Sequence, residues 1–184
     1  MTSNQNIYKI NLKFAVICLA AVFLTFFFHE GAHYLMGRVL GYDMWMNLNA
    51  AGLVEGQTYS EEWHKQLVSI AGPIFTIIQA LVFFYIIKKT KNLNWYPFLF
   101  IAAIMRIIAT FISAINKAND EARVSEWLGI GKMTLPIIVS IFLIGLVIIT
   151  STHNNIKWTF NLASFGFISI GITAVVFINQ YYLQ

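Results

Sequence analysis

The sequence predicts an all-α polytopic membrane protein, and its composition and long apolar runs are the observations that predict it. Of the 184 residues, 58% are hydrophobic and only 11% are charged, which lies far outside the range of soluble domains. Several runs reach the length of about 20 residues that a helix needs to cross a bilayer. We therefore expect residues 1–184 to form a single transmembrane domain of about five helices, because no room is left for a soluble domain of ordinary size.

Five apolar runs mark the expected membrane-spanning helices. They cover about residues 12 to beyond 33, 67–87, 95–115, 135–150 and 160–178. The last two runs carry no charged residue, and we assign them to packing. Arg106 lies near the middle of the third run. An arginine at that depth usually pairs inside the bundle or faces water, but the sequence does not identify its partner.

Residues 41–60 differ in character from the apolar runs on either side. Residues 42–49 alternate in part between apolar and polar side chains, and Ala51-Gly52 suggests a turn. Two interpretations stay open, a small hairpin at the membrane surface or an interfacial loop anchored by Trp45. As a hairpin, the segment would offer a free strand edge to an unwound substrate, with Asn47 and Asn49 as candidate substrate contacts.

The stretch Phe28-His29-Glu30-Gly31-Ala32-His33 ends the first apolar run and matches the H-E-x-x-H motif. On a helix, His29 and His33 lie on one face and can present two imidazoles to one metal ion. Glu30 lies beside that face and can act as general base on a metal-bound water. The simpler alternative is a set of polar residues at a membrane boundary. Ionisable groups at membrane depth cost several kcal/mol without partners, and this cost favours metal binding.

The acidic residues are distributed unevenly across the expected topology. Five alternating spans bring the end of the first, the start of the second and the end of the third to one membrane face. All 8 acidic residues of the chain belong to that face. The opposite face carries only basic residues, which are Lys9, Lys13, Lys88, Lys89, Lys91 and Lys157. The net charge of +4 is typical of membrane flanks and indicates the lipid bilayer, not nucleic acid, as the partner.

This topology brings a carboxylate from a distant part of the chain to the histidine pair. A catalytic zinc uses three protein ligands and one open position for water, and the single cysteine, Cys18, excludes a thiolate cluster. We expect Asp120 as the third ligand, with Glu121 as its competitor; the alternative is that both acids only solvate the end of the third span. Asn119 either orients the ligand, holds a substrate carbonyl or caps the next segment.

Gly72 and Pro73 fall in the first turns of the second span. Proline is tolerated in the first turn of a helix, and glycine permits close backbone approach. These two residues serve either helix packing alone or substrate binding.

Together these motifs resemble the site-2 protease family of intramembrane zinc metalloproteases. The matching elements are His29-Glu30-Gly31-Ala32-His33 at the end of one span, Ala71-Gly72-Pro73 in the next, and Asn119-Asp120 after the third. The resemblance covers about residues 12–126, which correspond to the three-helix catalytic core of the family, and leaves about 133–180 as accessory helices. The family usually shows an Asn-Pro-Asp-Gly type of sequence at the third element, whereas this chain continues Asp120 with Glu-Ala.

The resemblance implies an endopeptidase of the cell membrane that holds one zinc ion per chain through His29, His33 and Asp120. Glu30 would deprotonate the zinc water and later hand the proton to the leaving amine. The substrate would be a transmembrane protein that unwinds locally. Two rival functions remain: a zincin that cleaves at the membrane surface with Glu121 as third ligand, and a non-hydrolytic metal-binding protein or carrier. A carrier needs ionisable groups along a path across several spans, and these groups cluster at one face instead.

Overall fold

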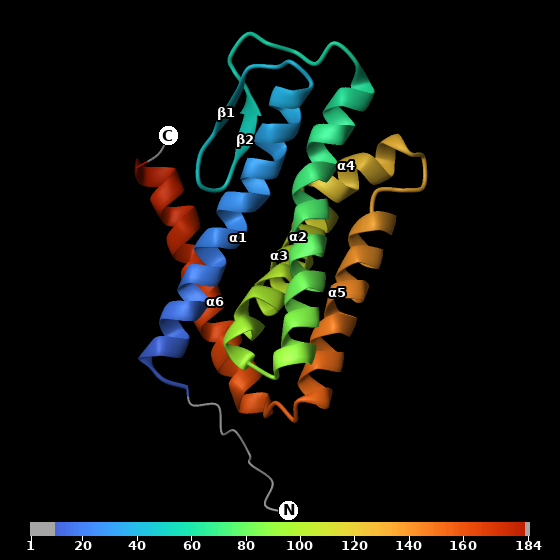
Figure 1. The fold of residues 1–184 in the computed structure, drawn as a ribbon. Helices are drawn as coiled ribbons and strands as arrows, with labels where there is room; N and C mark the ends of the chain where they lie inside the picture. The colour runs from blue at the N-terminus through green and yellow to red at the C-terminus, as the bar shows by residue number, and fades with distance from the viewer. Residues whose placement is uncertain (1–9, 183–184) are drawn as a thin grey trace, which may run out of the picture.

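The computed structural model describes residues 10–182, and it confirms the helical membrane protein that the sequence predicts (Figure 1). Six α-helices, a 3-10 turn and a small β-hairpin follow one another along this described chain. They are α1 Leu12–Val39, β1 Met44–Met46, β2 Ala51–Leu53, α2 Glu62–Thr90, η1 Leu93–Trp95, α3 Tyr96–Ile115, α4 Asp120–Trp127, α5 Thr134–His153 and α6 Trp158–Tyr182. Five segments are long and apolar enough to cross a membrane, namely α1, α2, η1 with α3, α5 and α6.

Successive long helices run in opposite directions, as the short connections between most of them require (Figure 1). Helix α1 packs against α2 and α6, and α3 packs against α2 and α5. The short helix α4 connects α3 to α5 and also contacts α2. The sequence did not predict α4, because its 8 residues are too few and too polar to form an apolar run.

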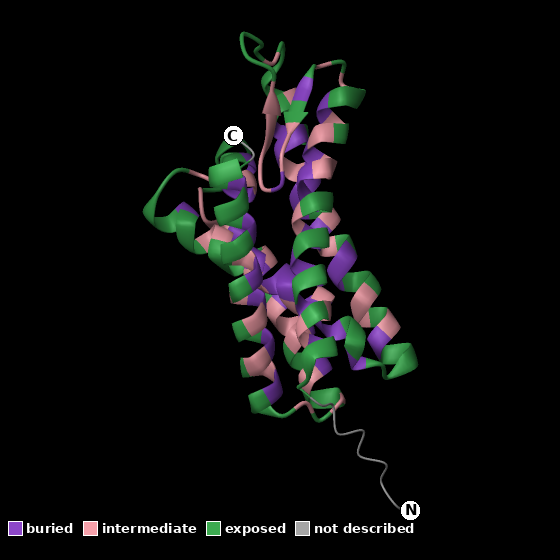
Figure 2. Ribbon diagram, turned by 90° about the vertical axis from the view of Figure 1, so that its left-hand side faces the viewer, coloured by how far each residue is buried: buried purple, intermediate pink, exposed green. Residues whose placement is uncertain are grey.

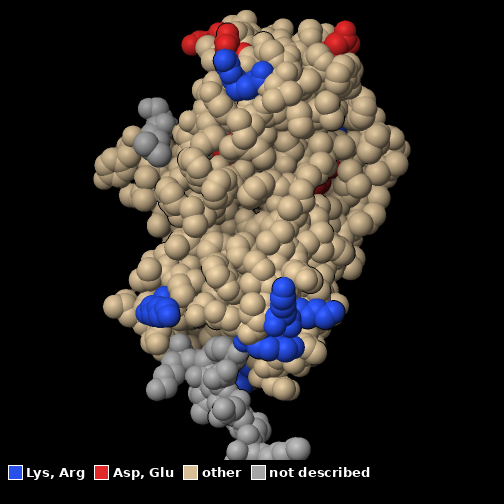
Figure 3. All heavy atoms as spheres, in the orientation of Figure 1, with Lys and Arg blue, Asp and Glu red and all other residues tan. Residues whose placement is uncertain are grey.

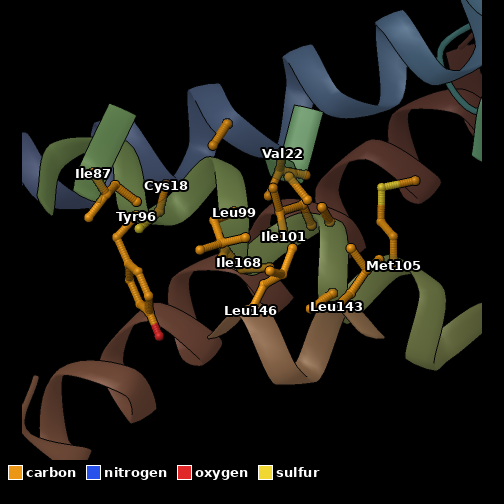
Figure 4. Close-up of a cluster of buried hydrophobic side chains, with 14 of the residues drawn as sticks. Cys18, Val22, Ile87, Tyr96, Leu99, Ile101, Met105, Leu143, Leu146 and Ile168 are labelled. Carbon is orange, nitrogen blue, oxygen red and sulfur yellow. The ribbon is translucent and has the colours of Figure 1, made fainter. Parts of the chain in front are cut away.

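The apolar core lies deep in the bundle. The residues that α1 contributes to this core precede the histidine motif in the chain. Figure 4 shows Cys18 and Val22 of α1, Leu99 of α3, Leu143 of α5 and Ile168 of α6 gathered in one cluster. Each of these residues is fully buried. Exposed residues, in contrast, lie on the outside of the bundle (Figure 2), where apolar side chains suit contact with lipid.

The hairpin that the sequence left open is present after α1, with β1 and β2 antiparallel and Trp45 opposite Gly52. Residues 47–50 form its turn, in which the Asn47 side chain accepts a hydrogen bond of 3.3 Å from the Asn49 N–H. The expected turn at Ala51-Gly52 is therefore wrong, because both residues belong to β2. The hairpin tip is anchored from a distant helix, since the Leu48 N–H donates to Asn179 Oδ1 of α6 at 3.1 Å.

Helix α2 begins at Glu62, five residues before the expected span, because its first turns are polar and extend beyond the apolar run. Pro73 consequently lies inside the helix and not in its first turns, as the sequence had suggested. Without an N–H, Pro73 leaves the Ser69 carbonyl outside the hydrogen-bond ladder of the helix.

The charged residues are distributed between the two ends of the molecule as the topology predicts. Figure 3 shows acidic side chains at the end that carries the hairpin, together with lysine or arginine. At the opposite end this view shows lysine and arginine alone. The acidic residues thus share one half of the bundle with the histidine motif.

Candidate metal centre

Helix α1 carries the H-E-x-x-H residues into the interior of the protein. His29, Glu30 and His33 are 3%, 8% and 6% exposed. His29 precedes the last residue of α1 by ten positions, which corresponds to about 15 Å along the helix axis. The two imidazole rings lie 4.8 Å apart between centroids and are nearly perpendicular, at 88°. Their Nε2 atoms lie 3.2 Å apart, so both rings present Nε2 to the same region.

The carboxylate that completes the group comes from the first residue of α4. Asp120 Oδ2 lies 3.4 Å from His29 Nε2 and 3.5 Å from His33 Nε2, and the two Nε2 atoms are 3.2 Å apart. A tetrahedral ion with bonds of 2.0–2.1 Å would hold its ligand atoms about 3.3–3.4 Å apart. The three donor atoms thus already stand at the spacing of one face of a tetrahedral metal site, and together they could hold a metal ion.

Hydrogen bonds on the far side of each ring determine where the imidazole protons sit. His33 Nδ1 lies 2.6 Å from the Val68 carbonyl oxygen, which can only accept, so Nδ1 carries the proton. The Thr76 hydroxyl donates to the Gly72 carbonyl at 3.1 Å and can therefore accept from His29 Nδ1, which is 2.9 Å away. These two bonds favour the neutral tautomer with the proton on Nδ1, which leaves Nε2 of each ring as the atom that can bind a metal ion, the arrangement that metal-binding histidines require.

Gly72 provides the space for the two rings. A Cβ atom at this position would collide with His33 Nε2 and would come within 2.6 Å of His29 Cε1. Pro73, the next residue, is fully buried. The structure therefore places Gly72 beside the imidazole pair, and neither Gly72 nor Pro73 lines the cavity described below.

Two arginines surround the acidic residues at the start of α4. Arg123 Nη2 donates to Asp120 Oδ1 at 2.6 Å. Arg106, whose partner the sequence could not identify, donates through Nη1 to Glu121 Oε1 at 3.0 Å, and both residues of this pair are buried. The competitor ligand Glu121 is thus bonded to a guanidinium, and Asp120 is the acid that meets the imidazoles.

Asp120 is held in the form that binds cations. Burial raises the pKa of its carboxyl, but in the metal-free site the hydrogen bonds that His29 and His33 donate when Nε2 is protonated outweigh burial and hold the pKa well below its ordinary value of 3.8. Asp120 is therefore a carboxylate at neutral pH.

A cavity of about 440 Å³ opens beside His33 and Asp120. Its lining combines the motif with residues from the hairpin, the loop after it, α2 and the start of α4, which are Glu30, His33, Asn49, Ala50, Ala51, Tyr59, Lys65, Val68, Ser69, Asn119, Asp120 and Arg123. Two predicted substrate contacts, Asn49 and Asn119, are among these residues. Asn47, another predicted contact, is not among them, and its side chain instead bonds the backbone of the hairpin turn. The cavity gives Glu30, His33 and Asp120 access to a reactant.

Sequence reasoning missed the groups that orient the histidines. Val68, Gly72 and Thr76 follow one another at intervals of four residues, which places them on one face of α2. That spacing could have marked the face as the partner of the histidine motif. Arg123 carried no comparable signal, because its role depends on the unexpected helix α4.

These features define the class of protein to which the chain belongs. It is a multi-pass membrane protein with a buried His-His-Asp group that could hold a metal ion. No family model, curated protein or solved structure matches the chain. Its chemistry is therefore argued from the geometry of the described residues.

Proposed function

We propose that the protein is an intramembrane zinc metalloprotease of the site-2 protease type, which hydrolyses peptide bonds of membrane-embedded protein substrates. One observation carries this proposal: two imidazoles and a carboxylate from distant segments converge at tetrahedral spacing, and Glu30 lines the same cavity as His33 and Asp120. Two histidines and one aspartate suit zinc, with one position left open for water. His29, His33 and Asp120 would hold one ion per chain.

Bound zinc would polarise the scissile carbonyl and lower the pKa of water enough to supply a nucleophile at neutral pH. Glu30 follows His29 directly on α1 and lines the cavity with His33 and Asp120. Its carboxylate would take a proton from the attacking water and give it to the leaving nitrogen as the peptide C–N bond breaks. The hydrogen bonds from His29 to Thr76 and from His33 to Val68 would keep both rings in place during the reaction.

The hairpin offers a place for the extended backbone of a substrate. The Asn47 N–H donates to the Ala50 carbonyl, and the Val54 N–H donates to the Asp43 carbonyl. In this register the N–H and C=O groups of Ala51 point away from β1, and Ala51 lines the cavity. An unwound transmembrane segment would pair with this edge.

Side chains at the cavity would complete substrate binding. Asn49 and Asn119 line it, and their amides would contact carbonyl groups of the substrate. The bilayer would deliver that substrate laterally as a helix, which must unwind before its shielded peptide bonds can be cleaved.

The rival functions receive less support from the described residues. Cleavage at the membrane surface with Glu121 as ligand conflicts with the bond between Glu121 and Arg106. A carrier needs a polar path away from the site, whereas the interior beyond it is a cluster of fully buried apolar residues such as Val22 and Leu99 (Figure 4).

Metal content and cleavage by the purified full chain test the proposal. Wild type should hold about one zinc per chain and cleave a transmembrane peptide in detergent or lipid. Glu30→Gln should keep the metal and lose cleavage, whereas Asp120→Asn should lose the metal. Glu121→Gln and the exposed control Glu126→Gln should keep it. Cleavage by Glu30→Gln at the wild-type rate would refute the hydrolytic function, and metal loss in Glu121→Gln alone would favour the surface zincin.

A further inference from the structure

The two oxygens of the Asp120 carboxylate face different partners. Oδ2 points to the imidazoles, 3.4 Å from His29 Nε2 and 3.5 Å from His33 Nε2. Oδ1 points the other way and accepts a hydrogen bond of 2.6 Å from Arg123 Nη2. The carboxylate is thus shared between a cationic donor on one side and the candidate metal position on the other.

Helix α4 holds this arrangement together as one unit. Arg123 follows Asp120 by three residues, so the two side chains meet on one face of the helix. The Arg123 N–H donates to the Asn119 carbonyl at 2.8 Å, and Asn119 is itself tied to α3. Its N–H donates to Ser113 Oγ at 3.1 Å, and its side-chain amide donates to the Ala109 carbonyl at 3.2 Å. The direction of the carboxylate is therefore determined by α3 and α4 together.

The second guanidinium near the Asp120 carboxylate, that of Arg106, is hydrogen-bonded to Glu121. Arg106 Nη1 lies 4.0 Å from Asp120 Oδ2, beyond hydrogen-bond reach, and 3.0 Å from Glu121 Oε1. Arg123 is therefore the residue that decides which oxygen of Asp120 stays free.

We propose that Arg123 makes Asp120 a monodentate ligand, and this inference rests on the proposed metal site. A carboxylate with two free oxygens can bind one ion through both of them, as acidic ligands of larger ions do. Such binding would add a further ligand and occupy the position that water needs. By holding Oδ1, Arg123 leaves Oδ2 alone for the metal and keeps the water position open. Arg123 is in this sense a positioning residue.

Removal of Arg123 should change ligand geometry more than the fold. Its side chain is 43% exposed, and exposed ion pairs add little to stability. The loss of a group that orients a metal ligand typically weakens metal binding by about 10- to 100-fold. A purely structural role would instead lower thermal stability and leave the coordination of bound metal unchanged.

Cobalt is a suitable probe, because the visible absorption of Co²⁺ weakens as its coordination number rises from four to five. The full chain in detergent would be loaded with Co²⁺ as wild type, Arg123→Met, Arg123→Lys and the exposed control Lys117→Gln. We expect strong four-coordinate absorption from wild type and Lys117→Gln. Arg123→Met should show weaker, five-coordinate absorption and about 10- to 100-fold lower Co²⁺ affinity, and Arg123→Lys should recover part of the wild-type spectrum.

The possible outcomes separate this inference from the proposed function. A wild-type spectrum in Arg123→Met would overturn the role of Arg123 while the metal site stands. Wild type that binds no Co²⁺, or Asp120→Asn that binds it unchanged, would overturn the metal site and the inference with it. Should Arg123→Met fail to fold, Arg123→Ala decides the question, because it also removes the donor to Oδ1: five-coordinate absorption would support the role of Arg123, and four-coordinate absorption would overturn it.

Discussion

Gly72→Ala tests the central packing feature of the site, which is the approach of two imidazole rings to the backbone of α2. The added Cβ would collide with His33 Nε2 and would lie 2.6 Å from His29 Cε1 and 2.8 Å from His29 Nε2. Carbon atoms in ordinary contact stand about 3.5–4.0 Å apart, so the rings must retreat by about 1 Å. Metal–ligand distances tolerate changes of only about 0.2 Å. The variant should therefore lose much of its metal affinity.

The size of the effect follows from the cost of overpacking. Inserting a methyl group into a packed interior typically costs about 1–3 kcal/mol. If that cost falls on the metal-bound geometry, affinity drops by about 5- to 150-fold. Helix propensity acts in the opposite sense, because alanine inside a helix is favoured over glycine by about 1 kcal/mol. The expected variant is thus a folded protein with a damaged metal site.

Competition with a chromophoric chelator would measure zinc affinity in detergent, and thermal unfolding of the metal-free protein would report the fold. Gly145→Ala is a matched control, because a Cβ at Gly145 of α5 meets nothing within 4 Å. Wild-type zinc affinity in Gly72→Ala would refute the packing argument and with it the placement of the rings against α2.

Two further substitutions test how the site and the hairpin are held. Thr76→Val removes the acceptor 2.9 Å from His29 Nδ1 at nearly constant side-chain volume. Zinc affinity should fall by about 10- to 100-fold. An unchanged zinc affinity would show that Thr76 does not orient the ring. Asn179→Leu leaves the N–H of the buried residue Leu48 without its acceptor, at a cost of about 1–3 kcal/mol. Amide exchange at Leu48 should accelerate while zinc affinity stays constant, and equal protection in both proteins would contradict the anchor.

Much of the fold could be predicted, because membrane-spanning helices leave a signal in length and hydropathy that does not depend on tertiary contacts. Helix α4 and the first turns of α2 were not predicted, because they consist of polar residues outside the apolar runs, and such residues leave no signal in hydropathy. The hairpin turn was misplaced because Gly52 resembles a turn residue. In the structure Gly52 instead makes room for the Trp45 ring, whose atoms would lie 3.2 Å from a Cβ there.

The site was predictable to the extent that it follows from helical spacing and from the alternation of spans. The four-residue interval predicts that His29 and His33 share a face, and the topology predicts an acid at their end of the bundle. The partner of Arg106 could not be predicted, because Glu121 reaches it only after the chain turns between α3 and α4. The role of Arg123 likewise requires the helical phase of α4.

The length of α3 places Asp120 at the same level along the bundle axis as His29 and His33. Phe14 of α1 and Tyr96 of α3 both contact the ring of Phe160, at centroid distances of 4.5 and 6.1 Å, so the two helices start at about the same level. From there His33 lies about 28 Å along α1, and the end of α3 lies about 28 Å along its own axis. Four alanines inserted into α3 would raise α4 by about 6 Å and should abolish zinc binding, whereas the same insertion in the loop 154–157 at the other end should not. Retained affinity in the α3 insertion would show that helix length does not position the third ligand.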